Sequence, residues 1–90
     1  MDGYVTIEMR VEIDPGATVA RHTHPGIESG YVVEGGIELT IEGEGARKLA
    51  VGDGFQVPTR TPHGGPNEPA KTVIISTSVV EKDKPLASPA

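Results

Sequence analysis

The 90-residue sequence contains no cysteine and no tryptophan, and its only aromatic residues are two tyrosines and one phenylalanine. Without cysteine, no disulfide can stabilise the chain and no thiol can act as a nucleophile. A domain of this length buries a modest fraction of its surface, so its stability margin is thin. A bound metal ion or a partner subunit would therefore add usefully to that margin.

The sequence is also poor in positive charge and in long apolar runs. Eight Lys and Arg residues are scattered among thirteen Asp and Glu, which gives a net charge of −5. An acidic chain without a basic stripe is not expected to bind nucleic acid or an anionic membrane surface. No apolar run approaches the ~20 residues of a membrane helix, and no secretion signal opens the chain. We predict a cytoplasmic location, or a periplasmic one if a leader once preceded the strand-like start.

Turn-forming residues are abundant, with 12 glycines and 8 prolines. Between them, apolar and polar residues alternate with the two-residue period of strands, and no segment has a helical period. This pattern predicts an all-β sandwich or barrel in one domain, residues 1–82, followed by a polar C-terminal arm, residues 83–90. The expected strands span residues 4–14, 18–24, 29–34, 37–42, 46–51, 55–58, a short segment at 63, and 71–81.

The three histidines and one glutamate are the strongest candidates for chemistry. His22 and His24 are two residues apart in an expected strand, so both imidazoles point to the same side. Glu28 follows a Pro-Gly pair, and the returning chain could aim its carboxylate at the same point. His63 could face them across a closed barrel. Three imidazoles and one carboxylate suit a divalent transition ion, whereas each residue taken alone reads more simply as a surface or turn residue.

The spacing of these residues resembles the two motifs of the cupin superfamily of small jelly-roll β-barrels. Glycine, five residues, H-x-H, three residues, glutamate, six residues and glycine fits Gly16 to Gly35. The second motif, from glycine through P-x-G to histidine and asparagine, fits Gly52, Pro58, His63 and Asn67, except that Arg60 replaces the second glycine. The resemblance implies antiparallel strands in two sheets and the metal ligands His22, His24, Glu28 and His63.

Several neighbouring residues receive weaker assignments. We expect turn chemistry rather than metal contact at Asn67. Arg60 would pay about 1 kcal/mol if its backbone needs a positive φ, and it is either an exposed loop residue or a holder of an anionic substrate. The other candidates for lining a substrate pocket, each of which could equally be simple core packing, are Met9, Tyr31, Val33 and Phe55.

The resemblance implies a range of functions, because the fold does not select among them. The first hypothesis is a metal-dependent oxidoreductase of the dioxygenase type that acts on a small organic molecule, using Fe, Mn, Ni, Cu or Zn. Glu28 would hold the ion and could act as a base. The alternative is a binding or sensor module without catalysis, and a metal-free epimerase-like enzyme is a third, weaker hypothesis. The apolar face of the first strand and the small barrel favour a homodimer.

Overall fold

The computed structural model describes residues 2–66 and 68–90, and within these residues every regular element is a strand. Asn67, for which turn chemistry is predicted, lies outside the described residues. No helix in the described part is long and apolar enough to cross a membrane. The strands are β1 (Tyr4–Ile13), β2 (Val19–Thr23), β3 (Gly26–Glu34), β4 (Gly36–Ile41), β5 (Gly45–Ala50), β6 (Gly54–Val57), β7 (His63–Gly65), β8 (Thr72–Glu81) and β9 (Ser88–Pro89).

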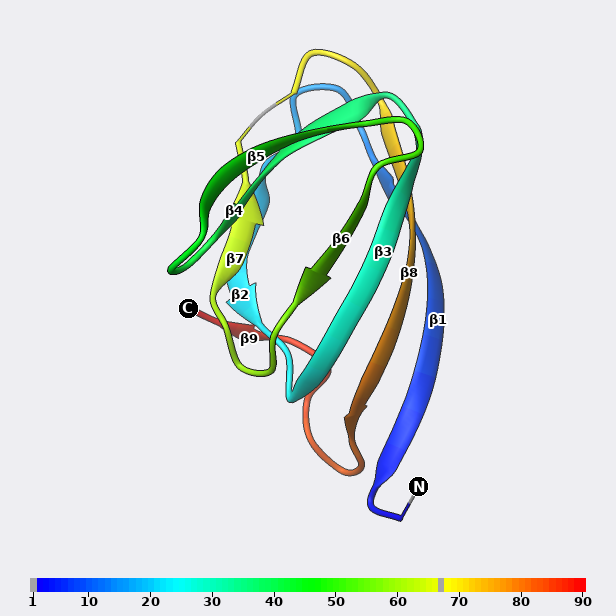
Figure 1. Ribbon diagram of the computed structural model, residues 1–90, viewed down its shortest axis with the longest axis vertical. Helices are drawn as coiled ribbons and strands as arrows, with labels where there is room; N and C mark the ends of the chain where they lie inside the picture. The colour runs from blue at the N-terminus through cyan, green and yellow to red at the C-terminus, as the bar shows by residue number, and fades with distance from the viewer. Residues whose placement is uncertain (1, 67) are drawn as a thin grey trace.

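The strands form two antiparallel sheets that face each other (Figure 1). The first sheet has the order β1-β8-β3-β6, and the second sheet has the order β5-β4-β7-β2-β9. Neighbours in each sheet are mostly distant in the sequence, which is how a jelly roll wraps its two sheets around one interior. The all-β, two-sheet prediction is therefore confirmed.

The interior between the sheets holds one group of buried apolar side chains, here called the apolar cluster. Alternation along β4 supplies three of its members, since every second residue of that strand points inward. Its buried members are Ile13, Val32, Ile37, Leu39, Ile41, Leu49, Phe55, Val57 and Ile74.

Strand β1 buries less of its apolar face than its alternation predicts. Ile13 is buried, but Val5 and Met9 each remain 38% exposed. The lower parts of β1, β8 and β3 extend beyond the second sheet in Figure 1, and the molecule is accordingly elongated, 40 × 23 × 20 Å. The first half of β1 therefore has little of the second sheet to pack against.

Strand β3 begins three residues earlier than predicted, at Gly26 instead of Ser29. It pairs with β8 from its first residue, with Gly26 opposite Val80. A Cβ on Gly26 would lie 1.9 Å from the Val79 carbonyl oxygen, so only glycine permits this close approach. As a result Glu28 lies within a paired strand, and the strand fixes the direction of its side chain.

The segment after β8 folds back onto the barrel. Residues Ser88–Pro89 form β9, which pairs with β2 at the edge of the second sheet. The Ala90 amide also donates a hydrogen bond to the Arg21 carbonyl, 3.2 Å away. The polar arm therefore lies beside the strand that carries the first two histidines.

Candidate metal centre

The three histidines converge from two neighbouring strands of the second sheet. His22 lies directly opposite His63 in the β2–β7 pair, and His24 follows just past the end of β2. The ring centroids are separated by 4.2 Å for His22 and His63, 4.7 Å for His22 and His24, and 5.0 Å for His24 and His63. One ring nitrogen from each lies within 4.8 Å of the other two. The sequence prediction that these histidines meet is consistent with this geometry.

Each imidazole is held through its Nδ1 by a backbone carbonyl. The acceptors are Ala20 for His22 at 2.8 Å, Leu86 for His24 at 2.7 Å, and Thr61 for His63 at 2.9 Å. A carbonyl oxygen only accepts, so Nδ1 must carry the proton in all three rings. Nε2 is then the nitrogen of each ring that is left to bind a metal ion when it is deprotonated, and carbonyls at Nδ1 orient histidine ligands in this way.

Glu28 approaches the histidines from the first sheet. Its Oε1 lies 3.4 Å from Nε2 of His24 and 3.2 Å from Nε2 of His63. Burial alone would raise the pKa of Glu28, but close contacts with the two imidazoles and their charge outweigh it and lower the pKa to about 2. The contact with Glu28 raises the pKa of His24, whereas burial lowers the pKa of His22. Glu28 is therefore an anion at neutral pH.

The donor set fits a divalent transition ion. Nε2 of His63 is buried and has no hydrogen-bond partner among residues 2–66 and 68–90, although Glu28 is within ion-pairing distance. A buried nitrogen lone pair left without a donor is costly unless something binds it. Three neutral imidazoles suit zinc, iron, copper, nickel or manganese, and the adjacent carboxylate can complete the set.

The histidines line a cavity of about 250 Å³, here called the histidine cavity. Its walls are mainly apolar and include two of the predicted pocket residues, Met9 and Phe55. Tyr31 and Val33 do not line it; both are exposed on the opposite face of β3 from Val32, because side chains alternate along a strand.

Arg60 also lies away from the histidine cavity. Its side chain is 60% exposed and forms an ion pair with Glu81 at the end of β8. Its backbone adopts a φ of 56°, so this position has the left-handed conformation for which glycine is favoured. The Arg60 amide donates to the His24 carbonyl at 3.0 Å, which helps to fix the residue that carries the second imidazole.

Three functional candidates in this cavity escaped the sequence analysis. The side chains of Ser76 and Ser78 line it, and the Leu86 carbonyl orients His24. Two serines at alternate positions of a segment rich in Val and Ile, residues 71–81, were a visible signal. The role of Leu86 had no sequence signal, because its contribution is a backbone atom 62 residues from its partner.

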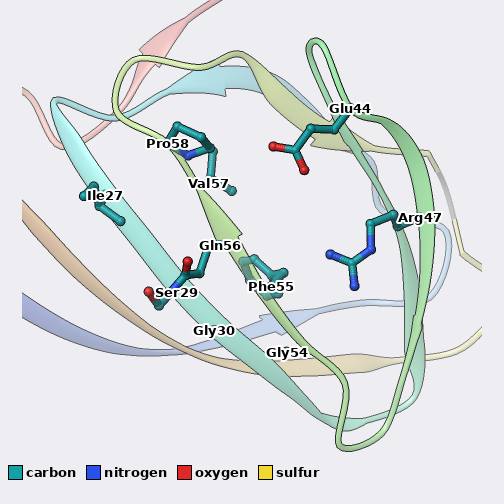
Figure 2. A pocket seen from close by; sticks show the side chains of 10 residues that line it. All are labelled: Ile27, Ser29, Gly30, Glu44, Arg47, Gly54, Phe55, Gln56, Val57 and Pro58. Carbon is teal, nitrogen blue, oxygen red and sulfur yellow. The ribbon is translucent and has the colours of Figure 1, made fainter.

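A larger, more open cleft of about 800 Å³ lies between β6 and the β4–β5 hairpin. Figure 2 shows Glu44 and Arg47 projecting from the hairpin into this space, toward the side of β6 that carries Phe55. Phe55 lines both this cleft and the histidine cavity, so its ring forms part of the wall between them.

Comparison with known families and structures accords with this geometry. The profile described as the Cupin domain matches residues 9–79. KdgF from Halomonas sp. is 38% identical, with a TM-score of 0.69, covering 87% of this chain and 72% of that protein. An RmlC-like cupin from Shewanella frigidimarina NCIMB 400 is 28% identical, with a TM-score of 0.75, covering 87% and 68% of the two chains.

The DMSP lyase DddQ from Ruegeria pomeroyi DSS-3 has a TM-score of 0.84 at 20% identity, which is a likeness of fold alone. That match covers 94% of this chain but 43% of the lyase, so this chain spans less than half of its length. No curated protein matches the sequence.

Proposed function

The chain belongs to the cupin family, and from this premise we propose that it is a metal-dependent enzyme acting on a small organic molecule, specifically an oxidoreductase of the dioxygenase type. The observation that carries the proposal is the meeting of three imidazoles, each with one ring nitrogen within 4.8 Å of the other two, while Nε2 of His63 is buried without a hydrogen-bond partner in the described residues. The enzymatic names of structural neighbours such as a DMSP lyase are compatible with catalysis but do not select the reaction.

In this proposal His22, His24 and His63 hold the ion, with Glu28 as the fourth ligand. Once bound, the ion would supply Lewis-acid chemistry and open coordination positions for dioxygen and substrate. The three backbone carbonyls keep the imidazoles in the neutral tautomer that can bind it. The apolar walls of the histidine cavity exclude water around the reacting group.

Glu28 has a second proposed role as a base. Its carboxylate is ionised at neutral pH and lies within 3.4 Å of two imidazole Nε2 atoms. A carboxylate oxygen of Glu28 that is not engaged by the ion would accept a proton from a substrate held in the histidine cavity. The strand position of Glu28 limits its movement to side-chain torsions, so the proton acceptor stays close to the ligands.

The first test is the metal content of tag-free protein, before and after reconstitution. We expect close to one equivalent of metal per chain. Less than about a tenth of an equivalent after reconstitution overturns the proposal. The second test loads the protein anaerobically with Fe(II) and measures oxygen uptake with catechols, thiols and diketones. Stoichiometric metal without uptake on any of these would favour the alternative function, a non-catalytic binding or sensor module.

We also propose a homodimer. The outer face of β3 presents Ile27, Tyr31 and Val33, which are 52%, 48% and 39% exposed. These side chains form an apolar strip on the first sheet that a second copy could cover. Light scattering at several concentrations would test this, and a mass of about 9.4 kDa throughout would exclude it.

A further inference from the structure

Two rows of side chains cross the inner face of the first sheet near the histidines. Register places Ile7, Ser78, Glu28 and Val57 side by side in one row across β1, β8, β3 and β6. The next row, in the same strand order, consists of Met9, Ser76, Gly30 and Phe55. Each row therefore contains one serine, and the two serines are inward neighbours on β8.

Both serine residues are almost completely buried, and their hydroxyls have no partner among the described residues. Ser76 is 2% exposed and Ser78 is 3% exposed, and both line the histidine cavity. Within the described part of the chain neither hydroxyl has a hydrogen-bond partner. Thr72, an inward residue of the same strand, differs in this respect, since its hydroxyl donates to the Gly36 carbonyl at 2.7 Å. A hydroxyl at a cavity wall without a protein partner is free to bond a molecule in the cavity, so these two groups can pair with a polar atom of a bound ligand.

The neighbours of the serines define what that ligand can be. Ser78 lies directly opposite Glu28, where side chains of paired strands are in contact range. An anionic group at the serines would therefore be repelled by the Glu28 carboxylate, whereas a neutral hydroxyl or carbonyl oxygen would not. Beside Ser76, Gly30 has no side chain and the Phe55 ring fills the space, since its Cζ would lie 2.6 Å from a Cβ built on Gly30. Apart from the three histidines, the remaining side chains that line the cavity are apolar.

We propose that Ser76 and Ser78 form a hydrogen-bonding subsite for the neutral oxygen of a small organic carboxylate whose acid group reaches the metal centre. The inference rests on the proposed function, because the carboxylate needs a bound cation. The cavity of about 250 Å³ limits the ligand to a short carbon skeleton. Ser76 and Ser78 are thus specificity-determining residues: they distinguish a hydroxy or keto acid from the same acid without that oxygen.

The test uses Co(II)-loaded protein, titrated with matched acids while its visible absorption is followed. The pairs are 3-hydroxypropionate with propionate and 4-hydroxybutyrate with butyrate. In at least one pair, we expect wild-type protein to bind the hydroxy acid roughly 3- to 10-fold more tightly than the acid without the hydroxyl. This is the gain in affinity expected from one or more hydrogen bonds. The double variant Ser76→Ala, Ser78→Ala should bring this ratio close to one with unchanged cobalt content. Ser29→Ala, on the opposite face of β3, should keep the wild-type ratio.

A second measurement separates this proposal from the metal proposal. In metal-free protein the double variant should melt several degrees higher than wild type, because two unpaired hydroxyls are removed from an apolar cavity. A wild-type ratio near one, or a variant that keeps the wild-type preference, overturns the subsite. A lower melting temperature in the variant also overturns it, since the serines would then be stabilising. Failure to bind cobalt overturns only the metal proposal. The melting comparison then still tests the role of the serines, because it uses metal-free protein.

Discussion

The apolar cluster and the histidine cavity are built on the same strands, yet they are packed by different rules. On β8, Ile74 belongs to the apolar cluster, while the next two inward residues are Ser76 and Ser78. On β3, Val32 is fully buried among apolar side chains, while Glu28 faces the imidazoles. In the apolar cluster every side chain gains free energy from burial, whereas the histidine cavity holds polar atoms whose partners are incomplete.

The two regions share a wall, since Ile13, Ile37, Leu39, Phe55 and Ile74 belong to the apolar cluster and also line the histidine cavity. Val32, Ile41, Leu49 and Val57 belong to the cluster without lining the cavity. The apolar cluster should stabilise the fold whether or not metal is present. The polar atoms of the histidine cavity should add further stability when a ligand occupies them. Mutations can therefore be sorted by whether their effect depends on metal.

The largest effect should come from the apolar cluster. Leu49 is 3% exposed and does not line the histidine cavity. Leu49→Ala should lower the free energy of unfolding by about 4 kcal/mol, because it removes buried methyl groups and leaves a cavity. Val51→Ala, at a side chain 61% exposed, is the control and should cost less than about 0.5 kcal/mol. Chemical denaturation measures both, and the loss should be equal with and without metal. A loss of stability found only in the metal-bound form would contradict the expectation that Leu49 acts independently of metal.

The next effect concerns Glu28 in metal-free protein at acid pH. A lowered pKa means that the ionised carboxylate stabilises the fold above its ordinary value of 4.5, and that this contribution is lost as the pH falls toward 2. The free energy of unfolding should drop by about 3 kcal/mol over this interval on account of this group. Glu28→Gln cannot lose a charge, so its stability should fall less steeply. If the free energy of unfolding falls equally steeply with pH in the variant and the wild type, Glu28 is not held by the imidazoles.

Removal of a histidine ligand should abolish the metal-dependent part of stability, whatever it also changes in the metal-free protein. At a metal concentration 100 times Kd, binding should add about 2.7 kcal/mol to the wild type. His22→Ala and His63→Ala should each abolish the corresponding rise in melting temperature. Calorimetry with and without metal measures this rise, and if both variants retain it, the ligand assignment is wrong.

Loss of a positioning contact should have a smaller effect. Ending the chain at Pro85 removes the Leu86 carbonyl that accepts from His24 Nδ1. Metal affinity should fall about 10-fold, as it does when ligand-orienting partners are lost. Leu86→Ala retains the carbonyl and serves as the control, with affinity close to wild type. Titration with a competing chelator compares them; equal weakening of both would assign the effect to the leucine side chain.

The smallest effect is expected at Arg60, outside both regions. Arg60→Ala loses the ion pair with Glu81 but keeps a side chain at φ 56°, whereas Arg60→Gly loses the same ion pair and removes the steric conflict. The glycine variant should be more stable than the alanine variant by about 1 kcal/mol. Thermal melts of the pair measure the difference, and an alanine variant as stable as the glycine variant would show that this turn relaxes.

The sequence was sufficient for the all-β class, and the three histidines that it singled out lie together in the structure. Alternation and turn signals predicted a strand near each of β1 to β8, and the H-x-H spacing predicted that the imidazoles of His22 and His24 point to one side. The start of β3 was misplaced, because Pro25-Gly26 was interpreted as a turn, although Gly26 is the residue that lets β3 approach β8.

Other features depend on contacts that single-strand patterns do not contain. The pocket candidates Tyr31 and Val33 share a strand with Glu28, but they have the opposite parity and face outward. The unpaired state of Ser76 and Ser78 is visible only when their neighbours across β1 and β3 are known. The hydrogen bond from His24 to Leu86 joins positions with no periodic relation.

That last contact has a consequence for the order in which the protein is made. Strands β2 and β7 carry the imidazoles early and midway in synthesis, but His24 receives its orienting carbonyl only when residue 86 has been added. A nascent chain that has already completed β8 therefore has its barrel strands but lacks one element of the metal centre. Chains interrupted in this last stretch would fold and yet hold metal weakly, so metal retention would report whether translation has passed residue 86.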